Sequence, residues 1–322
     1  MTIPAMMRAV AIDRHGGPSV LTMHSVPVPS PGPNEVLIAV HTAGVGTWDS
    51  HMREEPSESG HEHFPKILGT DGSGRIVATG SRVRRLRTGN RVFAYSYDNP
   101  KGGFYAEYVA MPATNVARVP SGFDLSQAGA VTATALTALQ GVDEALNLRR
   151  GETILIHGAS GSVGSLALQF ARARGARVLA TASGKDGVSF VRRLGADLAV
   201  DGKRDDIQAI ARAFAPEGLD AVLAFVGGAS LTQCLSALRR GGRVAHPNGI
   251  APVPRKRRGI TITAYDAEAG IHELERLDRA MRQARLQIPI AKVYTLANAV
   301  RAHRRLARGH VLGKVVLRVA KS

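Results

Sequence analysis

The stretch GETILIHGASGSVGSLALQFARARG, residues 151–175, predicts a strand, a glycine-rich turn and a helix in that order. Thr153–Ile156 is an apolar run typical of a buried strand, and Gly158, Gly161 and Gly164 follow it. Apolar residues then recur with a helical period as far as residue 171. Because backbone N–H groups at the start of a helix bind negative charge, this arrangement can hold a diphosphate.

The three glycines have separate roles in such a turn. The first permits a tight bend, the second lets the backbone approach a ligand, and the third lets helix and strand pack closely. The spacing is GxxGxxG rather than GxGxxG, so the flanking strand and helix carry the inference, and a turn that merely joins them is the alternative. We expect the cofactor phosphates to be bound by Gly158, Ala159, Ser160, Gly161, Ser162, Val163 and Gly164.

Composition favours a protein of a reducing compartment. The chain has 322 residues, 44% of them hydrophobic, which is enough for a large core and about two domains. Its single cysteine, Cys234, excludes an intramolecular disulfide and a multi-cysteine zinc site. The amino terminus lacks a signal-peptide pattern, and no apolar stretch approaches the ~20 residues needed to cross a bilayer. We therefore expect a cytoplasmic protein with no membrane partner.

The charge balance is strongly basic, with a net charge of +16 and a pI of about 10.8. Two basic runs, Arg82–Arg91 and Arg255–Arg258, could suit a nucleic acid or another polyanion. Neither run contains aromatic residues that could stack on bases, and no helix-turn-helix or zinc-finger pattern accompanies them. Solvated faces are therefore the favoured interpretation, nucleic acid is not the expected partner, and polyanion binding is kept as an alternative.

The chain divides into a β-rich part and a part in which helices and strands alternate. The first ~120 residues contain short apolar runs separated by Pro- and Gly-containing turns, which suggests an antiparallel barrel-like module. From Asp124 the alternation predicts an α/β fold with a doubly wound parallel sheet. The expected strands are 153–157, 177–181, 198–200, 221–225, 242–246 and 260–264. The expected helices are 125–147, 163–174, 185–194, 205–214, 230–238 and 268–285.

Many ordered motifs resemble the zinc-independent, quinone oxidoreductase branch of the medium-chain dehydrogenase/reductase superfamily. They include RAVAIDRHGGPSVL, PGPNEVLIAVHTAGVGTWDSHMR, PKILGTDGSGRIVATGSRVRRLRTGNRVF, GGFYAEYVAMP, ALTALQGV, GASGSVG, RRLGADLAVD, LRRGGRVAHPNG and AHRRLARGHVLGKVVL. The resemblance implies a GroES-like β-barrel-type catalytic domain made from 1–123 and 267–322. A doubly wound Rossmann cofactor domain, 124–266, would be inserted between them. It also implies a cofactor in the cleft between the domains and a homodimer joined through Rossmann sheet edges.

The resemblance also bears on zinc. Zinc-dependent relatives place a Cys ligand in the turn equivalent to Ala43–Asp49 and a His-Glu pair in the segment equivalent to Gly69–Gly72. Here those segments read AGVGTWD and GTDG, with neither thiol nor imidazole. A cluster of His51, His61, Glu62 and His63 lies in what reads as a hydrophilic loop, HMREEPSESGHEH, without helical spacing to converge on an ion. We expect no metal.

The end of the second strand of the alternating part favours NADPH over NADH. An NAD-selective fold usually carries Asp or Glu there, to bond both ribose hydroxyls. Here the strand is followed by Ser183 and Lys185, a hydroxyl and an ammonium that would hold a 2′-phosphate. Lys185 matches the lysine that the family uses on that phosphate, although a helix cap and a solvated charge are the alternative. Gly202 replaces a tyrosine found in some relatives, which leaves the strength of the preference open.

The reacting centre is expected in the turn 46–53. In the quinone oxidoreductase branch this turn often reads Asn-x-x-Asp/Glu-x-Tyr-x-Arg, and here it has Gly46, Asp49, His51 and Arg53. A histidine at the tyrosine position could donate a proton to a developing enolate or phenolate, although a polar residue without a chemical role is the favoured reading of His51. Thr137 matches a family threonine near the nicotinamide.

Further residues are assigned by type and by place in the family pattern. Gly46, Trp48, Tyr95 and Tyr97 are the candidate substrate pocket, with ordinary packing as the alternative for the aromatic residues. Strand ends at the carboxyl edge of the sheet are where ligands bind in this fold. Residues there or beside the cofactor cleft are Phe225, Val226, Gly227, His246, Asn248 and Lys314.

These features predict an NADPH-dependent oxidoreductase that transfers hydride without a metal. Quinones and α,β-unsaturated carbonyls are the expected acceptors, because both accept hydride without metal polarisation, and the pocket would align them and exclude water. An NADP-linked alcohol dehydrogenase-like carbonyl reductase is the nearest alternative. A non-catalytic NADPH-sensing or polyanion-binding protein is an alternative of another class.

Overall fold

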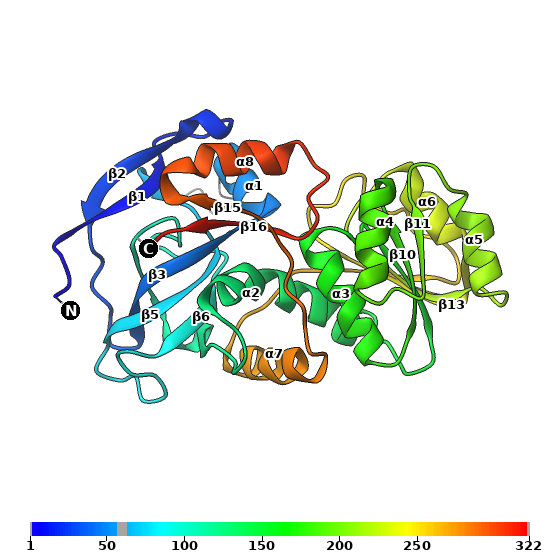
Figure 1. The fold of residues 1–322 in the computed structure, drawn as a ribbon, viewed down its shortest axis with the longest axis horizontal. Coiled ribbons are helices and arrows are strands. Elements are labelled where there is room, and N and C mark those ends of the chain that lie inside the picture. The colour runs from blue at the N-terminus through cyan, green and yellow to red at the C-terminus, as the bar shows by residue number, and fades with distance from the viewer. Residues whose placement is uncertain (1, 57–62, 321–322) are drawn as a thin grey trace.

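A six-stranded parallel sheet occupies the right-hand half of the computed structural model, which describes residues 2–56 and 63–320 (Figure 1). Its spatial order is β11-β10-β9-β12-β13-β14, the order 3-2-1-4-5-6 of a Rossmann-type doubly wound fold. Every neighbouring pair is parallel. The strands are β9 (Thr153–His157), β10 (Arg177–Ala182), β11 (Leu198–Asp201), β12 (Leu219–Ala224), β13 (Leu238–Pro247) and β14 (Thr261–Tyr265).

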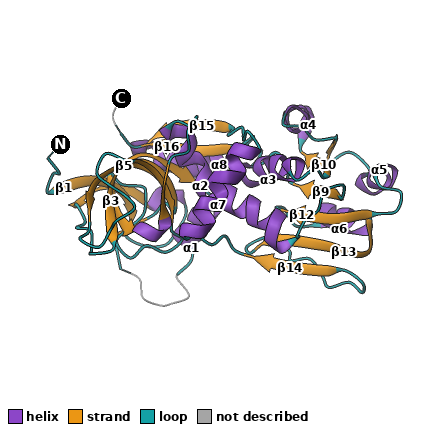
Figure 2. Cartoon of the chain, turned by 90° about the horizontal axis from the view of Figure 1, so that it is seen from below, coloured by secondary structure: helices purple, strands orange, loops and turns teal. Residues whose placement is uncertain are grey.

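Helices cover both faces of this sheet. Successive residues of β9 point to opposite faces, and because they are apolar, both faces must be shielded from water. Ile154 and Ile156 belong to one apolar cluster, with α3 (Ser162–Ala173) and α4 (Gly184–Arg193). Leu155 belongs to another, with α5 (Ile207–Phe214) and α6 (Ala229–Ser236). Figure 2 shows the strands stacked from β10 to β14 with helices on either side. The predicted α/β fold is confirmed, and each of these helices begins and ends within two residues of its predicted bounds.

Two further sheets form the β-rich half. The larger follows the order β15-β16-β3-β5-β6-β8, with β7 also paired to β3, and the smaller is β2-β1-β4. The C-terminal strand β16 lies antiparallel to β3, so both ends of the chain contribute to this half (Figure 1). The strands are β1 (Met6–Ile12), β2 (Leu21–Pro27), β3 (Glu35–Val45), β4 (Lys66–Ile67), β5 (Asp71–Thr79), β6 (Arg91–Tyr95), β7 (Tyr108–Pro112), β8 (Val116–Arg118), β15 (Ile290–Thr295) and β16 (Lys314–Arg318).

Two helices connect the halves. Helix α2 (Leu125–Gln140) is buried from Ala128 onward, and α7 (Ile271–Gln283) packs beside it. The helix expected over 125–147 ends early, and a π-helical turn, Gly141–Ala145, continues it. A Cβ on Gly141 would lie 2.2 Å from the hydroxyl oxygen of Tyr265, so close packing against β14 requires glycine there. The domain boundaries at 123/124 and 266/267 remain a prediction.

One local expectation was wrong. The segment from His51 to Glu54 was expected in a loop, but it forms the end of helix α1 (Thr47–Glu54). Asp49 lies in the first turn and accepts a hydrogen bond from the backbone N–H of Gly46, which stabilises the start of this helix. The remaining helix, α8 (Ala299–Ala307), precedes β16. In the described part of the chain, no helix is long and apolar enough to cross a membrane.

Candidate active site

The glycine-rich turn connects β9 to α3 as the sequence predicted. Gly158 has a φ of +83°, in the left-handed region that glycine adopts without strain. A Cβ on Gly164 would lie 2.3 Å from the carbonyl oxygen of Gly158, whereas a Cβ on Gly161 would meet only that oxygen, at 3.5 Å. Gly161 precedes α3 without a side-chain cap, so the first N–H groups of the helix are left for a ligand. The turn therefore fits a diphosphate.

Two polar residues behind the turn hold it in place. The hydroxyl of Thr181, at the end of β10, accepts a hydrogen bond from the N–H of Gly158 at 3.2 Å and lies 2.8 Å from Nδ1 of His157. The other ring nitrogen of His157 lies 3.0 Å from the hydroxyl of Ser230 in α6. Burial lowers the pKa of His157 to about 4, so the imidazole is neutral near pH 7 and supports the turn as a hydrogen-bonding group.

The ends of β10 and β11 lie side by side, and they present hydroxyl and cationic groups. Ser183 makes no capping hydrogen bond to α4, and Lys185 is exposed. Asp201, the last residue of β11, accepts one backbone N–H on each carboxylate oxygen, from Gly184 at 3.1 Å and from Lys203 at 3.0 Å. That carboxylate therefore holds the backbone at the start of α4 and in the turn after β11.

A hollow of about 580 Å³ lies just beyond these strand ends. Its lining residues come from the turn after β11 and from helices α5 and α6: Gly202, Lys203, Arg204, Asp205, Asp206, Gln208, Ser230 and Gln233. The hollow is linked to the glycine-rich turn through Ser230, whose hydroxyl is hydrogen-bonded to His157, the residue just before the turn. It is polar and carries both signs of charge.

The remaining predicted cofactor residues lie at the same carboxyl edge. Phe225 follows β12 and donates its backbone N–H to the carbonyl of His157 at 3.0 Å. Val226 is half exposed, and a Cβ on Gly227 would lie 2.4 Å from the carbonyl oxygen of Ala251. His246, in β13, is buried with Nδ1 3.0 Å from the carbonyl of Pro247. The Asn248 side-chain amide donates to Asp266 at 2.7 Å.

The strand β16 joins the two halves at the glycine-rich turn. Gly313 pairs with Gly161, and its N–H donates to the carbonyl of Ser160 at 3.1 Å. The next residue, Lys314, was predicted beside the cofactor. Its backbone follows the residue that pairs with the glycine-rich turn, but its side chain enters the β-rich half and is only 3% exposed.

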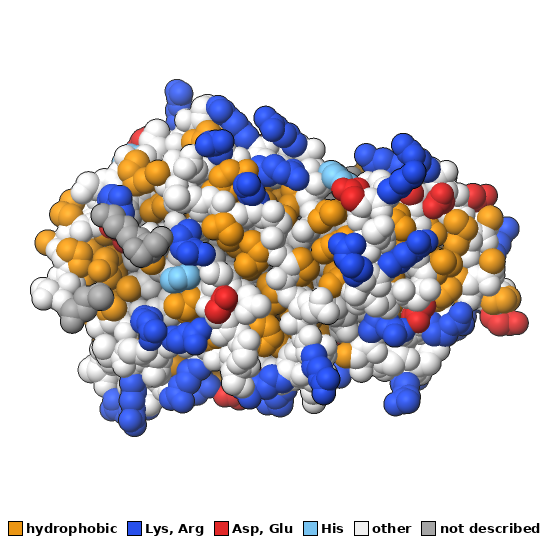
Figure 3. Space-filling view, viewed as in Figure 1, with side chains coloured by type: hydrophobic (Ala, Val, Ile, Leu, Met, Phe, Trp, Pro, Cys, Tyr) orange, Lys and Arg blue, Asp and Glu red, His pale blue; other side chains and the backbone are white. Residues whose placement is uncertain are grey.

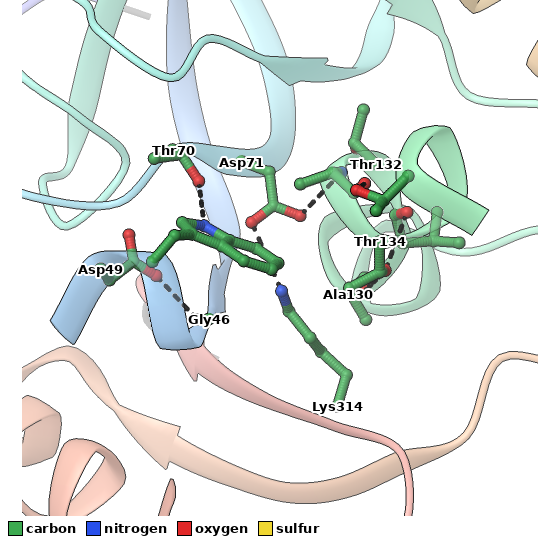
Figure 4. Close-up of polar contacts among 12 residues, drawn as sticks. Gly46, Asp49, Thr70, Asp71, Ala130, Thr132, Thr134 and Lys314 are labelled. Atoms are coloured by element: carbon green, nitrogen blue, oxygen red, sulfur yellow. Dashed lines mark hydrogen bonds and ion pairs between the residues drawn. The ribbon is translucent and has the colours of Figure 1, made fainter. Parts of the chain in front are cut away.

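The Lys314 ammonium lies among residues of α1 and β5 (Figure 4). Its Nζ is 3.6 Å from Oδ1 of Asp71 and 4.6 Å from the centroid of the Trp48 ring. The indole N–H of Trp48 donates to the hydroxyl of Thr70 at 2.6 Å. Asp71 also accepts the backbone N–H of Ala133 in α2 at 3.1 Å. Burial raises the pKa of Asp71, and the nearby Lys314 opposes that rise.

Asp49 is the second buried carboxyl group. Burial raises its pKa to about 7, while the hydrogen bond from Gly46 and the charge of Lys314 oppose the rise. Its Oδ2 also accepts the hydroxyl of Tyr105 at 3.3 Å, and its Oδ1 has no hydrogen-bond partner. Near neutral pH this carboxyl group is therefore partly protonated.

A hydrogen-bonded chain continues from Tyr105 to Arg53. Tyr105 Oη lies 3.1 Å from Nε2 of His303, and Nδ1 of His303 accepts from Arg53 Nη1 at 2.5 Å. Because arginine can only donate, His303 carries its proton on Nε2, donates it to Tyr105, and leaves the tyrosine to donate to Asp49. Burial lowers the pKa of His303 to about 3, in keeping with this neutral tautomer. Arg53 also donates to the carbonyl of Gly16 and to Glu54.

The other predicted residues are more dispersed. His51 lies on α1, with its Cε1 3.5 Å from where a Cβ of Gly249 would lie, so this helix faces the loop after β13. Thr137, in α2, donates its hydroxyl to the carbonyl of Ala133 at 2.8 Å. Tyr95 is buried at the end of β6, whereas Tyr97 is 53% exposed. Burial raises the pKa of Tyr95.

The metal prediction falls partly outside the structure, since His61 and Glu62 are not among the described residues. Within 2–56 and 63–320, no group of three or more His, Cys, Asp or Glu side chains could hold a metal ion. The absence of a metal from the reaction stays a prediction.

Sequence reasoning missed the polar residues that surround Asp49. Asp71 was considered only as part of a segment without zinc ligands, and Tyr105 and His303 were not considered. One signal was available: His303 lies among the apolar positions of its helix, and an unexplained polar residue there often marks a buried network. Nothing local could link Asp71 to Lys314, which lies 243 positions later in the chain.

Two family models match the chain. The alcohol dehydrogenase GroES-like domain matches residues 32–121, and the zinc-binding dehydrogenase family matches residues 194–317. The quinone oxidoreductase of Lama guanicoe is 32% identical over 325 residues, which cover 97% of each chain.

Solved structures agree over nearly the whole chain. A structure described as an NAD-dependent alcohol dehydrogenase is 32% identical, with a TM-score of 0.89 over 98% of this chain and 100% of its own. A mycobacterial protein in complex with NADPH is 28% identical, with a TM-score of 0.86 over 97% of this chain and 100% of its own.

Proposed function

Because this chain belongs to the quinone oxidoreductase branch of the medium-chain dehydrogenase/reductase superfamily, we propose that it transfers hydride from NADPH to quinones or α,β-unsaturated carbonyls. It is an oxidoreductase, and its relatives act on small molecules. The observation that carries the proposal is the backbone at Gly161, where the open start of α3 adjoins the strand that leads to Lys314.

The cofactor would be held mainly by backbone groups. The N–H groups of Ser162, Val163 and Gly164 open α3, and the positive end of the helix would face the diphosphate. The hollow beside Lys203 and Arg204 would take the adenosine end, and the bound nicotinamide would supply the hydride. Thr181 and His157 act behind the turn as positioning residues.

NADPH is preferred in this proposal because of the residues that follow β10. An acid that selects NADH accepts hydrogen bonds from the ribose hydroxyls at the end of the second strand, and the three residues that follow β10 include no acid. Ser183 and Lys185 would instead meet a 2′-phosphate with a hydroxyl and an ammonium. The NADPH complex of the mycobacterial relative is consistent with this preference.

The chain's own residues would align the acceptor and exclude water. Helix α1 places His51 toward the loop after β13, where it is the candidate donor of the proton that follows hydride transfer. Asp49 caps α1, and Arg53 fixes the tautomer of His303, so both act as positioning residues. Thr137, Tyr95 and Tyr97 would complete the pocket. We propose that no metal takes part, since neither Ala43–Asp49 nor Gly69–Gly72 supplies a thiol or imidazole.

Two alternatives differ in what supports them. The likeness to an NAD-dependent alcohol dehydrogenase favours a carbonyl reductase as the second candidate, with His51 as the acid that polarises the carbonyl. A polyanion-binding or NADPH-sensing role rests on the net charge alone. In Figure 3 the Lys and Arg side chains are scattered over the face shown, with apolar and acidic groups between them.

We also propose a cytoplasmic homodimer. The outer edge of β14 pairs with no strand among the described residues, and two copies could extend the sheet through this edge. Sedimentation velocity should give the mass of two chains. A single-chain mass at micromolar concentration would contradict the dimer.

An acceptor assay tests the proposed function. Chelator-treated protein, checked for zinc by elemental analysis, should oxidise NADPH with 1,4-benzoquinone and with methyl vinyl ketone, but not with acetaldehyde. Turnover of acetaldehyde alone would favour the carbonyl reductase. Tight NADPH binding without oxidation by any acceptor would favour the sensor, and activity that required added zinc would exclude the metal-free reaction.

A further inference from the structure

Helix α6 forms one wall of the polar hollow beyond the ends of β10 and β11. Ser230 and Gln233 are the two residues of this helix that line the hollow. They lie three positions apart, which places their side chains next to each other on one face of the helix. Ser230 is half-buried and Gln233 is exposed. A hydroxyl and a carboxamide therefore lie side by side on the wall of the hollow.

The acidic residues of the hollow already serve the backbone. Asp205 and Asp206 each accept a backbone N–H, at 2.8 and 3.0 Å. The neutral polar side chains of the lining are those of Gln208, Ser230 and Gln233. An uncharged heterocyclic ring in the hollow would therefore find its hydrogen-bonding partners among these three.

The imidazole of His157 lies between Ser230 and two buried residues. Its Nε2 is 3.0 Å from the hydroxyl oxygen of Ser230. Its Nδ1 is 2.8 Å from the hydroxyl oxygen of Thr181 and 3.5 Å from the sulfur of Cys234. Because the imidazole is neutral near pH 7, one ring nitrogen donates a hydrogen bond and the other accepts one.

The nitrogen that accepts is Nδ1. Thr181 already accepts the N–H of Gly158 at 3.2 Å. If Thr181 also accepted from Nδ1, its own buried hydroxyl proton would have no acceptor within the described part of the chain. The buried thiol of Cys234 is a second donor that faces the same nitrogen. His157 therefore donates from Nε2 to Ser230, and the proton of the Ser230 hydroxyl is left for a ligand in the hollow.

We propose that Ser230 and Gln233 recognise the base of the dinucleotide and make this chain selective for adenine over hypoxanthine. This inference rests on the proposed function, in which the hollow takes the adenosine end, and it names the residues that select the base there. Adenine presents a 6-amino donor beside a ring-nitrogen acceptor. The hydroxyl of Ser230 donates to that nitrogen, and the carboxamide oxygen of Gln233 accepts from the amino group. Hypoxanthine has an oxygen at position 6 and a proton on N1, so it does not match this pair.

The same hydrogen bonds connect base recognition to the diphosphate turn. Thr181 accepts from Gly158 in that turn and, through His157, sets the direction of the Ser230 hydroxyl. Neither Thr181 nor His157 lines the hollow, so both are positioning residues for the base. Without the Thr181 hydroxyl, His157 is free to take the other tautomer, and Ser230 then turns its proton toward Nε2.

Calorimetric titration with NADPH and with its hypoxanthine analogue, reduced nicotinamide hypoxanthine dinucleotide phosphate, tests the proposal without turnover. Wild-type protein should bind the analogue at least tenfold more weakly, because the Ser230 donor and the Gln233 acceptor would be left unpaired. Ser230→Ala should lower this ratio of dissociation constants about fivefold. Gln233→Glu, whose carboxylate only accepts, should raise the ratio. The matched control is Ser236→Ala, because Ser236 is also in α6 but does not line the hollow, and its ratio should equal that of wild type.

Thr181→Val separates the positioning role from support of the turn. Loss of support alone would weaken the binding of both dinucleotides equally and leave their ratio unchanged. Loss of the Ser230 orientation should also lower the ratio, by a factor of about three. Thr181→Ser keeps the hydroxyl and should restore the wild-type ratio. A ratio that is the same in wild type and Thr181→Val would show that Thr181 does not orient Ser230.

The outcomes separate the base selection from the proposed function. If wild-type protein binds both dinucleotides equally and reduces its acceptors, the base selection is wrong and the proposed function stands. The base selection is also wrong if Ser230→Ala keeps the wild-type ratio. The predicted ratios without reduction of any acceptor would support the base selection and contradict the proposed reaction. If wild-type protein binds neither dinucleotide, both proposals fail. If Thr181→Val does not fold, the comparison of Ser230→Ala with Ser236→Ala decides.

Discussion

The glycine-rich turn and the buried cluster around Lys314 are adjacent in space but are built in opposite ways. The turn is made of backbone groups from one continuous segment, Gly158–Gly164, and its geometry requires glycine where a Cβ would clash. The cluster is made of side chains from α1, β5 and β16, of which Asp71 and Lys314 lie 243 positions apart. Gly313 and Lys314, consecutive in the chain, connect the two sites.

This difference decides how each site responds to change. A backbone site tolerates exchange of its side chains but not an added Cβ at a close approach. A buried charge cluster tolerates little change of charge, because removal of one partner leaves the other desolvated.

Gly164→Val should have the largest effect. A Cβ there would lie 2.3 Å from a backbone oxygen that cannot move aside freely, so the turn must open. We expect NADPH binding to fall at least 1,000-fold, which is about 4 kcal/mol, as measured by calorimetry.

The matched variant is Gly161→Ala, whose added Cβ meets a single atom at 3.5 Å and whose φ of −72° suits alanine. It should keep the wild-type Tm and lose affinity for NADPH, because the methyl group would face the diphosphate. Equal losses of Tm in both variants would mean that the close approach is not what Gly164 provides.

Lys314→Met tests the buried cluster, and its expected effect is of comparable size. It leaves Asp71 buried without its cation, and such a loss typically costs about 3 kcal/mol of unfolding free energy. The control is Lys101→Met, whose partner Glu35 is closer, at 2.5 Å, but whose ammonium is partly exposed. A surface pair should contribute less than about 1 kcal/mol in urea unfolding. The contrast is wrong if the shorter, exposed pair proves the more stabilising.

Asp49→Asn tests the electrostatics of the cluster through pH. Because the folded pKa is about 7 and the unfolded value is near 3.8, the folded state keeps a proton that the unfolded state releases. The contribution of Asp49 to stability is therefore greatest below pH 4 and declines as the pH rises to 7. Relative to wild type, Asp49→Asn should gain about 2 kcal/mol between pH 5.5 and 8. A difference in unfolding free energy that stays constant over this range would contradict the raised pKa.

The sequence was sufficient for elements whose signals are local. The run Thr153–His157 and the glycines after it gave the first strand and the turn, because a parallel strand buried on both faces is apolar throughout. The doubly wound parallel sheet then followed from the alternation of strands with helices. The sequence was not sufficient at α1. The residues 51–54 are polar and read as a loop, but they end a short helix whose buried side chains are the charged residues Asp49 and Arg53.

The candidate site likewise has a part that the sequence could predict and a part that it could not. The residues at the strand ends are brought to one edge by topology, so their neighbourhood was predictable, although their contacts with a cofactor stay a prediction. The direction of the Lys314 side chain was not predictable, because it depends on β16 lying beside β3 and on the missing Cβ of Gly44. Such tertiary conditions have no local sequence signal.

We propose above that the start of α3 and the ends of β10 and β11 bind NADPH in preference to NADH. Calorimetric titration of both dinucleotides into wild-type protein and into Lys185→Ala tests it most directly. We expect tighter binding of NADPH to wild type, and in the variant a roughly tenfold loss for NADPH alone, about 1.4 kcal/mol. Equal affinities of wild type for the two dinucleotides, or no heat with either, would contradict it.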